Sequence, residues 1–342
     1  MRTAIFSAHK FEKTFFEQAN KDFGHALTFF EPRLSEQTAA LAKGYDAVCA
    51  FVSDQLNEKT LEQLKAQGTQ IIALRSAGFN HVDLDAAARL RLPVVRVPEY
   101  SPYAVAEHAV ALLLALNRKI HRAYDRVRES NFSLDGLVGF DIHGKTVGVI
   151  GSGKIGSVFA RIMKGFGCRV LAYDVQPNTI LEKTYGVECA SLEEIYRSSD
   201  IISLHVPLNP KTKHLIDEAV FKKMKPGVTL INTGRGALID TRALITALKN
   251  GTIVAAGLDV YEEEEQLFFQ DLSDQVLQDD VFARLLTFPN VLITSHQAFL
   301  TSEALVNIAT TTLSNITEFE KSRSLVNEVR AQTHISRTGK AS

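Results

Sequence analysis

Residues 139–156, GFDIHGKTVGVIGSGKIG, contain two overlapping candidates for a phosphate-binding loop. Residues 139–146 fit G-x-x-x-x-G-K-[ST], the P-loop pattern, and residues 151–156 fit G-x-G-x-x-G, the dinucleotide pattern. A P-loop needs a buried strand before it and a helix that starts at its lysine. Here the order is reversed, because polar residues precede the first motif and the apolar run 147–150 follows it. We therefore expect residues 139–146 to form a turn that leads into a strand.

The second motif has the order that a dinucleotide site requires. The apolar run 147–150 leads into the glycine loop, and residues 157–165 continue as a helix. Asp174 ends the next apolar run, eighteen residues after the last glycine, where a carboxylate accepts hydrogen bonds from an adenosine ribose. Asp174 would repel the 2′-phosphate of NADP, and residues 175–178 contain no arginine, so we expect NAD as the cofactor. The motif places the cofactor at Gly151, Gly153, Lys154, Gly156 and Asp174.

Short apolar runs alternate with amphipathic segments along most of the chain. This alternation predicts an α/β fold with two Rossmann-like, doubly wound parallel sheets. The first series has strands at 3–7, 26–30, 46–51, 71–74 and 94–97, and the second at 147–150, 170–173, 201–205, 229–232, 255–258 and 291–294. Helical spacing of apolar residues from Val105 to Val127 predicts one long helix between the two series, and residues 302–319 are expected to form another. The tail after about Asn327 is polar and is expected to be frayed.

Composition excludes several classes of partner. The 342 residues include 38 Lys+Arg and 39 Asp+Glu, and a net charge of −1 gives no reason to expect nucleic acid or a membrane as a partner. Cys49, Cys168 and Cys189 are odd in number and widely spaced, so neither a disulfide framework nor a metal site is expected. Reduced thiols and the lack of a signal-peptide pattern at residues 1–10 predict a cytoplasmic protein.

Three segments place polar residues directly after apolar strands, where open α/β sheets bind their ligands. Arg235 lies between two glycines after residues 229–232 and offers a planar fork to a carboxylate. His296 follows the run 291–294, and His205 ends the run 201–205 and is expected to line the cofactor cleft. The acidic run 262–265 follows a third strand, although such a run is by itself more typical of a solvated surface. An arginine, an acid and a histidine in a Rossmann domain suggest hydride transfer to a 2-oxo acid.

The chain resembles the D-2-hydroxyacid dehydrogenases, and within them it is most similar to the fermentative D-lactate dehydrogenases of bacteria. The resemblance runs from residue 1 to about 330, with ALRSAGFNHVDL, VPEYSPYAVAEHA, VGVIGSGKIG, NTGRGALID, GLDVYEEE and SHQAFLT as its most specific stretches. It implies that Arg235, Glu264 and His296 are the catalytic residues. It selects Glu264 by its offset of five from Asp259, and it gives the other acids of that run no role.

The same resemblance implies a larger set of binding residues and a domain order. The substrate domain would comprise 1–100 and 299–342, with the NAD domain 101–298 inserted into this flavodoxin-like domain. The cofactor would contact Ile155, Asp174, Val206, Pro207, Thr212, Thr233, Gly234 and Asp259, the last through the nicotinamide amide. The substrate would contact the backbone N–H groups of Ser76, Ala77 and Gly78, with Tyr100 and Phe299 closing a small pocket. The expected reaction is reversible reduction of pyruvate to D-lactate, and the expected assembly is a homo-oligomer, a dimer or a tetramer.

Two alternatives remain open from the sequence. Another 2-oxo acid, such as glyoxylate, hydroxypyruvate or a branched 2-oxo acid, could be the substrate. A dinucleotide-sensing binding module built on the same fold would also keep the three catalytic residues, although the chain lacks the disordered tails typical of such proteins. NADH oxidation with pyruvate present separates an enzyme from a binding module.

Overall fold

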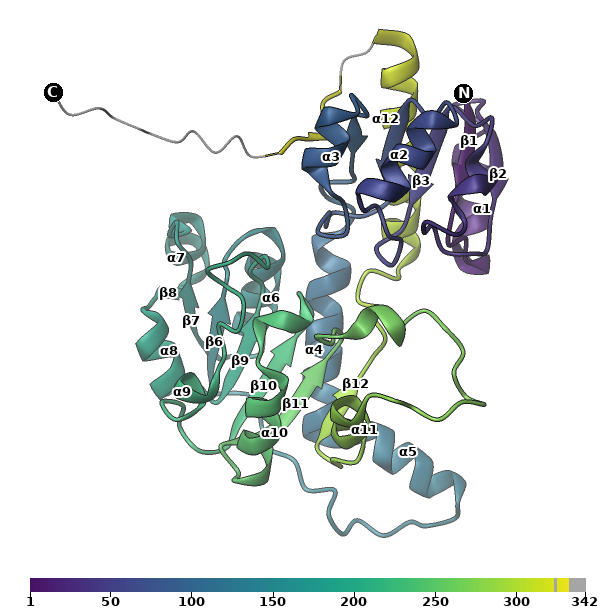
Figure 1. Ribbon diagram of the computed structural model, residues 1–342. Helices are drawn as coiled ribbons and strands as arrows, with labels where there is room; N and C mark the ends of the chain where they lie inside the picture. The colour runs from purple at the N-terminus through teal and green to yellow at the C-terminus, as the bar shows by residue number, and fades with distance from the viewer. Residues whose placement is uncertain (323–324, 332–342) are drawn as a thin grey trace, which may run out of the picture. The chain divides into compact units, whose positions relative to one another are not determined.

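The computed structural model describes residues 1–322 and 325–331, and the chain divides into two compact units (Figure 1). The first contains Met1–Ser101 and the segment from Thr301, and the second is Pro102–Leu300. The boundaries expected from the sequence, after residues 100 and 298, lie one and two residues earlier. Each unit is described by itself below.

The first unit is built on a six-stranded sheet with the order β13-β5-β4-β3-β1-β2. The five strands that come first in the chain are parallel, and they lie in the order 2-1-3-4-5 that is typical of flavodoxin-like folds. The strands are β1 (Arg2–Ile5), β2 (Ala26–Phe29), β3 (Ala47–Ala50), β4 (Ile71–Leu74), β5 (Val94–Val95) and β13 (Glu328–Val329). Almost every residue of β3 and β4 is buried, as expected for strands covered on both faces.

Alternate strand residues of this sheet face two separate groups of helices. Ile5 and Cys49 pack with α1 (Lys10–Ala19) and α12 (Ser302–Ser322). Val48 and Ile72 pack in another cluster with α2 (Glu58–Ala66) and α3 (Leu84–Arg89). Helix α12, from the end of the chain, therefore covers one face of this sheet together with α1.

The expectation of a frayed tail after Asn327 is wrong for the part of the tail that the structure describes. Glu328 and Val329 form β13, which pairs antiparallel with β5. An added strand satisfies the edge of β5, and two residues are too short a strand to give a sequence pattern. Residues 332–342 lie outside the described residues.

The second unit is built on a seven-stranded parallel sheet with the order β12-β11-β10-β9-β6-β7-β8. From β8 to β12 this is the 3-2-1-4-5-6 order of dinucleotide-binding folds, extended by one strand. The order reverses between β6 and β9, so the loops that follow these two strands meet at the switch point. The strands are β6 (Thr146–Ile150), β7 (Arg169–Tyr173), β8 (Glu188–Cys189), β9 (Ile201–Leu204), β10 (Val228–Asn232), β11 (Ile253–Leu258) and β12 (Val291–Ile293).

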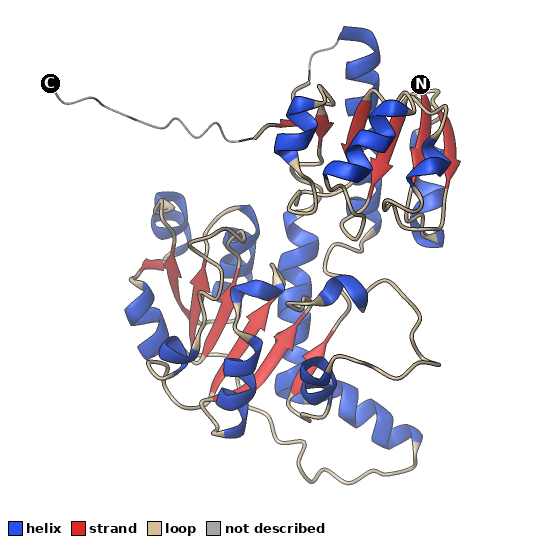
Figure 2. Ribbon diagram, in the orientation of Figure 1, coloured by secondary structure: helices blue, strands red, loops and turns tan. Residues whose placement is uncertain are grey.

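Helices cover both faces of this sheet (Figure 2). One core cluster contains α4 (Pro102–Arg118) and α6 (Lys154–Gly165) with alternate residues of β6 and β7. The other cluster is formed with α8 (Leu192–Ser198), α9 (Glu218–Phe221), α10 (Thr241–Lys249) and α11 (Asp280–Leu286). Among the helices described, none combines the length and the apolar character needed to cross a membrane.

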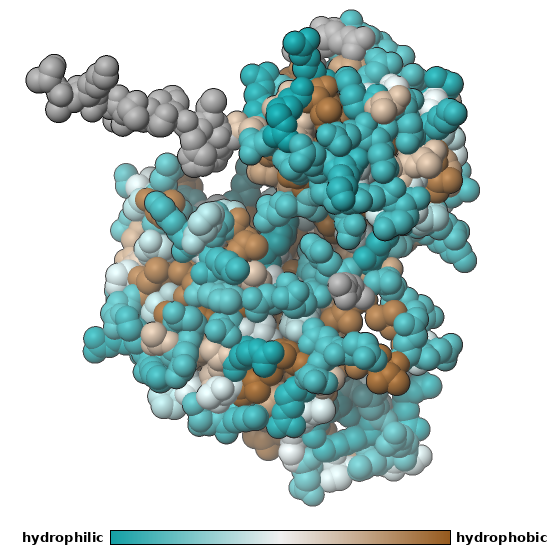
Figure 3. Space-filling view, in the orientation of Figure 1, coloured by the Kyte–Doolittle hydropathy of each residue, from teal (hydrophilic) through white to brown (hydrophobic). Residues whose placement is uncertain are grey.

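The single long helix expected over 105–127 is in fact two helices. Helix α4 ends at Arg118, and α5 (Ile120–Arg128) begins after Lys119, whose φ of 50° lies in the left-handed region. One left-handed residue breaks a helix without disturbing the apolar spacing, so the spacing alone could not reveal the break. The large apolar side chains of α5 are exposed. The molecular face drawn in Figure 3 is mostly hydrophilic, so exposed apolar side chains of this kind are the exception there.

Candidate active site

The loop between β6 and α6 packs so tightly that two of its glycines admit no side chain. Gly151 has a φ of +100°, and an added Cβ would lie 2.5 Å from the carbonyl oxygen of His205. A Cβ on Gly156 would lie 1.8 Å from the oxygen of Gly151, whereas Gly153 faces open space. Helix α6 begins at Lys154, so its N-terminal N–H groups and the positive end of its dipole lie next to the open space at Gly153. The loop can therefore accept an anionic phosphate.

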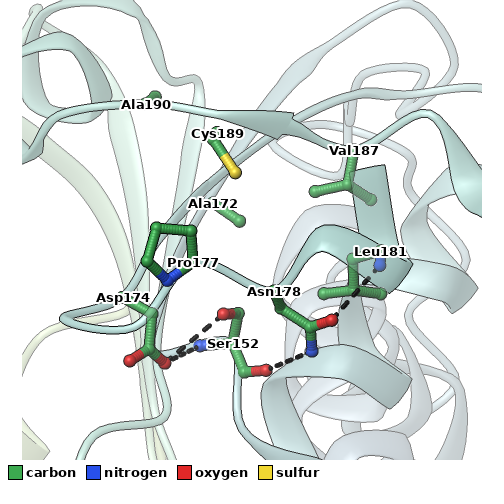
Figure 4. A pocket seen from close by; sticks show the side chains of 9 residues that line it. All are labelled: Ser152, Ala172, Asp174, Pro177, Asn178, Leu181, Val187, Cys189 and Ala190. Carbon is green, nitrogen blue, oxygen red and sulfur yellow. Dashed lines mark hydrogen bonds between the residues drawn. The ribbon is translucent and has the colours of Figure 1, made fainter. Parts of the chain in front are cut away.

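Asp174 lies directly after β7 and is held against the glycine loop. Its Oδ2 accepts a 2.7 Å hydrogen bond from the backbone N–H of Ser152, and its Oδ1 accepts one from Gln176 at 3.2 Å. Asn178 Nδ2 donates to the carbonyl oxygen of Ser152 at 3.0 Å. Figure 4 shows Ser152, Asp174 and Asn178 lining a cavity together with Cys189 and with Leu181 of α7 (Thr179–Tyr185). Because Oδ2 also accepts from the Ser152 hydroxyl at 3.3 Å, Oδ1 is the carboxylate oxygen that keeps a second lone pair for a ribose hydroxyl.

His205 is partly buried and packs against the glycine loop, where its backbone lies against Gly151 and its Cβ against Gly156. Its ring packs on Phe159 with the centroids 5.0 Å apart, and its Nε2 shares a 2.9 Å hydrogen bond with Ser203 Oγ. Burial lowers the pKa of His205 to about 3. The imidazole is therefore neutral near pH 7 and supplies no positive charge to a phosphate.

The other residues expected at the cofactor lie on the loop after β9 and at the start of α6. Val206 and Thr212 are partly buried, while Pro207 is exposed. The Thr212 hydroxyl donates to the carbonyl oxygen of Pro207 at 2.7 Å and so closes the loop on itself. Lys154 and Ile155 are the first two residues of α6.

The loop after β10 carries Arg235, and the side chain of Asn232 fixes the backbone of this loop by hydrogen bonds. Asn232 Oδ1 accepts from the N–H of Gly234 at 3.0 Å, and its Nδ2 donates to the carbonyl oxygen of Arg235 at 2.9 Å. The partly buried guanidinium donates through Nη1 to the oxygen of Gly234 at 2.7 Å. A guanidinium has five N–H donors in a planar fork, which suits a carboxylate.

His296 and Glu264 form a hydrogen-bonded pair, as the resemblance implied. His296 Nδ1 and Glu264 Oε1 lie 2.7 Å apart, with the side chains 16% and 19% exposed. The second oxygen, Oε2, accepts a 2.9 Å hydrogen bond from the backbone N–H of Tyr261, which fixes the carboxylate. His296 itself has a φ of 53°, a strained conformation that is concentrated at functional sites. With Nδ1 bound to the carboxylate, Nε2 is the ring nitrogen that remains for a substrate.

Asp259 organises the loop that carries His296. The side chain is completely buried. Its Oδ1 accepts from Thr294 Oγ1 at 2.5 Å and from the N–H of Gln297 at 2.9 Å, and its Oδ2 accepts from Ala298 at 2.9 Å. The carbonyl oxygen of Asp259 also accepts from the N–H of His296 at 2.7 Å. Asp259 therefore ties the loop 294–298 to the end of β11, a task that the sequence did not suggest.

Two more histidines of this unit have polar partners near the candidate site. His108 on α4 lies 3.1 Å from Thr294 Oγ1 and 3.4 Å from Asp259 Oδ1. His214 Nε2 lies 2.5 Å from Oε1 of Glu262, an acid that had no expected role. The partners are 186 and 48 residues apart in the chain, so local spacing gave no signal for either contact.

Comparison with known proteins identifies the family. Residues 110–298 match the family profile described as D-isomer specific 2-hydroxyacid dehydrogenase, NAD binding domain. The chain belongs to the D-isomer specific 2-hydroxyacid dehydrogenases. It is 53% identical over 329 residues to a D-lactate dehydrogenase of Escherichia coli, covering 96% of this chain and 100% of that protein.

Solved structures of D-2-hydroxyacid dehydrogenases have the same fold. The pyruvate reductase of Chlamydomonas reinhardtii matches with a TM-score of 0.91 at 48% identity, over 96% of this chain and 98% of that one. A D-lactate dehydrogenase of Aquifex aeolicus, solved with NAD and lactic acid, matches with a TM-score of 0.82 at 35% identity, over 94% and 96%. The expected α/β fold and family are thus confirmed.

The residues of this D-2-hydroxyacid dehydrogenase fit the NAD that its family binds. Besides the open backbone at Gly153, the hydroxyl of Thr233 is buried and has no hydrogen-bond partner among the residues described. Such a buried hydroxyl is costly unless a ligand satisfies it. Both lie after parallel strands at the carboxyl edge of the sheet, where dinucleotides bind.

Four of the five expected substrate residues belong to the first unit. Ser76 Oγ donates to the carbonyl oxygen of Gly78 at 2.7 Å, and Arg96 Nη1 donates to that of Ala77 at 2.7 Å. These bonds hold the turn after β4. The backbone oxygen of Tyr100 accepts a hydrogen bond from an asparagine of α12. Phe299, partly buried, belongs to the second unit.

Proposed function

We propose that this chain is an NAD-dependent D-lactate dehydrogenase that reversibly reduces pyruvate to D-lactate. The observation that carries the proposal is the His296–Glu264 pair at 2.7 Å, on a family NAD-binding domain that also presents Arg235 after a neighbouring strand. The relatives with about half of their residues identical include proteins named D-lactate dehydrogenase and pyruvate reductase.

NADH supplies the hydride that reduces the ketone carbon. Arg235 binds the substrate carboxylate through its fork and polarises the ketone oxygen. His296 transfers the proton from Nε2 to that oxygen during reduction and takes it back during oxidation. Glu264 fixes the ring through Nδ1 and stabilises its protonated form before the transfer.

Further roles follow from the resemblance. The N–H groups of Ser76, Ala77 and Gly78 would bind the substrate carboxylate. Tyr100 and Phe299 would limit the C3 group to about a methyl. The remaining cofactor contacts would be those predicted from the sequence, including Asp259 toward the nicotinamide amide. The first unit would then be the substrate domain and the second the NAD domain.

The cofactor is proposed to be NAD(H) rather than NADP(H). Asp174 is anchored by the glycine loop, so its charge cannot swing away from a 2′-phosphate. The segment 175–178 offers no arginine to neutralise that phosphate.

We further propose that the chain forms a homo-oligomer through α5. Ile120, Tyr124 and Val127 follow one face of this helix and are 55%, 60% and 54% exposed. A groove lined by these residues, Ala123 and two arginines continues the patch. A second copy of the chain would cover it, which sedimentation velocity tests. Tyr124→Glu should reduce a dimer or tetramer to smaller species, and an unchanged species would exclude α5 as the interface.

We place the protein in the cytoplasm. Cys49, Cys168 and Cys189 are all free thiols, as is typical of reducing compartments. Fractionation of cells that produce the chain from its own gene tests this location.

Initial rates of NADH oxidation test the proposed function and its competitors together. Pyruvate, hydroxypyruvate, glyoxylate and 2-oxoisocaproate are compared at equal low concentration. The proposal predicts the highest rate with pyruvate and a graded loss of about 1–3 kcal/mol per added methylene. Faster reduction of 2-oxoisocaproate would replace the substrate and keep the reaction class, whereas NADH binding without turnover of any 2-oxo acid would favour a binding module.

A further inference from the structure

Glu262 is held by two side chains that no expected role explains. Its Oε1 lies 2.5 Å from His214 Nε2, and its Oε2 accepts a 3.1 Å hydrogen bond from Thr241 Oγ1. The Glu262 side chain is 23% exposed, whereas its neighbour Glu263 is exposed. A carboxylate with a donor on each oxygen is fixed in direction, unlike a solvated surface acid.

Both partners of Glu262 are attached to the segment that carries Arg235. The backbone N–H of His214 donates to the carbonyl oxygen of Ala237 at 2.8 Å, two residues after Arg235. Thr241 is the first residue of α10, which starts directly after the same loop. Through these contacts, the Glu262 carboxylate is linked to the segment 235–241 at two points, at Ala237 through His214 and at Thr241 directly.

The other side of Glu262 leads to the acid–base pair. Glu262 lies in the turn 261–264, and the N–H of Tyr261 binds Oε2 of Glu264 at 2.9 Å. The turn also touches the arginine loop through its backbone. A Cβ added to Gly236 would lie 2.0 Å from the carbonyl carbon of Tyr261 and 2.3 Å from the backbone nitrogen of Glu262. The two backbones are therefore in direct contact, and only a glycine at 236 permits it.

We propose that Glu262 is a positioning residue that sets the guanidinium of Arg235 relative to the Glu264–His296 pair. This inference rests on the proposed function, in which Arg235 and His296 act on one substrate molecule. Glu262 touches neither substrate nor cofactor in this proposal, and it acts by joining two loops with His214 and Thr241. A displacement of about 1 Å between reacting groups costs roughly 10²-fold in rate, so such a brace affects turnover more than binding.

The test compares Glu262→Ala and Glu262→Gln with Glu263→Ala, a matched change at the exposed neighbour. We expect Glu262→Ala to lower kcat about 10- to 100-fold, while the Kd for NADH, measured by its fluorescence, stays within about twofold of wild type. Glutamine can accept from His214 and donate to Thr241, so Glu262→Gln should recover most of kcat. Glu263→Ala should match wild type. The assay uses the 2-oxo acid that wild type reduces fastest, so a wrong substrate assignment shows in wild type alone.

A purely structural role would give a different pattern. Glu262→Ala would then lower Tm while the folded enzyme kept its kcat, and this result overturns the proposal. Should Glu262→Ala fail to fold, Thr241→Val carries the test, because it removes one donor and keeps the side-chain shape. It should lower kcat about 3- to 10-fold. A Thr241→Val variant with the kcat of wild type would contradict the brace. Where Glu262→Ala does fold, the Thr241→Val effect on kcat should largely vanish in the Glu262→Ala background, and additive effects would also contradict the brace.

Discussion

The ring of His296 is held through a hydrogen bond of its Nδ1 atom. Nδ1 is bound to Glu264 and the backbone N–H to the carbonyl of Asp259, so rotation of the ring is restricted while Nε2 is left for proton transfer. Replacing the ring by glutamine keeps a polar side chain without a titratable group. We expect His296→Gln to lower kcat for pyruvate reduction by about 10²–10⁴ with little change in NADH affinity. Stopped-flow measurement of NADH oxidation checks this, and a loss under tenfold would remove His296 as the acid.

Glu264 offers a separate test through pH. Glu264→Gln can keep a hydrogen bond to His296 but removes the charge that stabilises the protonated ring. We expect the pH–rate profile of reduction to move toward acid, with a smaller loss of kcat at its optimum than in His296→Gln. A profile that coincides with that of wild type would take Glu264 out of the acid–base system.

Arg235 contributes geometry as well as charge. Lysine at this position keeps the charge but lacks the planar fork that spans two oxygens. We expect Arg235→Lys to cost about 2–4 kcal/mol of transition-state stabilisation, calculated from kcat/KM. If kcat/KM for the lysine variant stays near the wild-type value, Arg235 only attracts the substrate electrostatically.

At the scale of single elements, helix α6 contains two glycines, Gly156 and Gly165, for which we expect opposite effects of substitution by alanine. A Cβ on Gly156 would lie 1.8 Å from the oxygen of Gly151, whereas Gly165 at the end of the helix has nothing within 4 Å. Gly156→Ala should displace the phosphate loop and weaken NADH binding at least tenfold. Gly165→Ala should leave binding unchanged and raise stability by up to about 1 kcal/mol. Fluorescence titration with NADH and thermal melts measure both, and equal behaviour of the two variants would contradict the loop geometry.

The elements most readily predicted were those with a strong local pattern. Each strand expected in the two series is present within one or two residues, because a fully buried parallel strand is a continuous apolar run. The break at Lys119 and the strand β13 were not predictable, since one left-handed residue and a two-residue pairing leave no periodic signal. The glycine loop and the Arg235 loop follow from local sequence and strand order. The contacts of Glu262 with His214, and of His108 with Thr294, join distant segments and required the fold.

At the scale of the whole molecule, the neutral ring of His205 predicts that acid lowers the stability of the fold. Burial lowers the pKa of His205 from 6.5 to about 3, so only the unfolded chain takes up a proton there between these values. The contribution of the neutral His205 ring to the free energy of unfolding is complete above pH 6.5 and is lost as the pH falls toward 3. For His205 this amounts to about 2 kcal/mol between pH 7 and pH 5. Urea unfolding at both pH values should show a smaller loss in His205→Gln than in wild type, and equal losses would mean that the native ring is protonated.

For the molecule as a whole, we propose an NAD enzyme that acts on the D-enantiomer of lactate. Initial rates of NAD⁺ reduction by the purified chain, with D-lactate and L-lactate in parallel, test that claim most directly. We predict rapid reduction with D-lactate and a rate with L-lactate at the level of the enzyme-free control. Equal rates with both enantiomers, preference for L-lactate, or no reaction with either would contradict it.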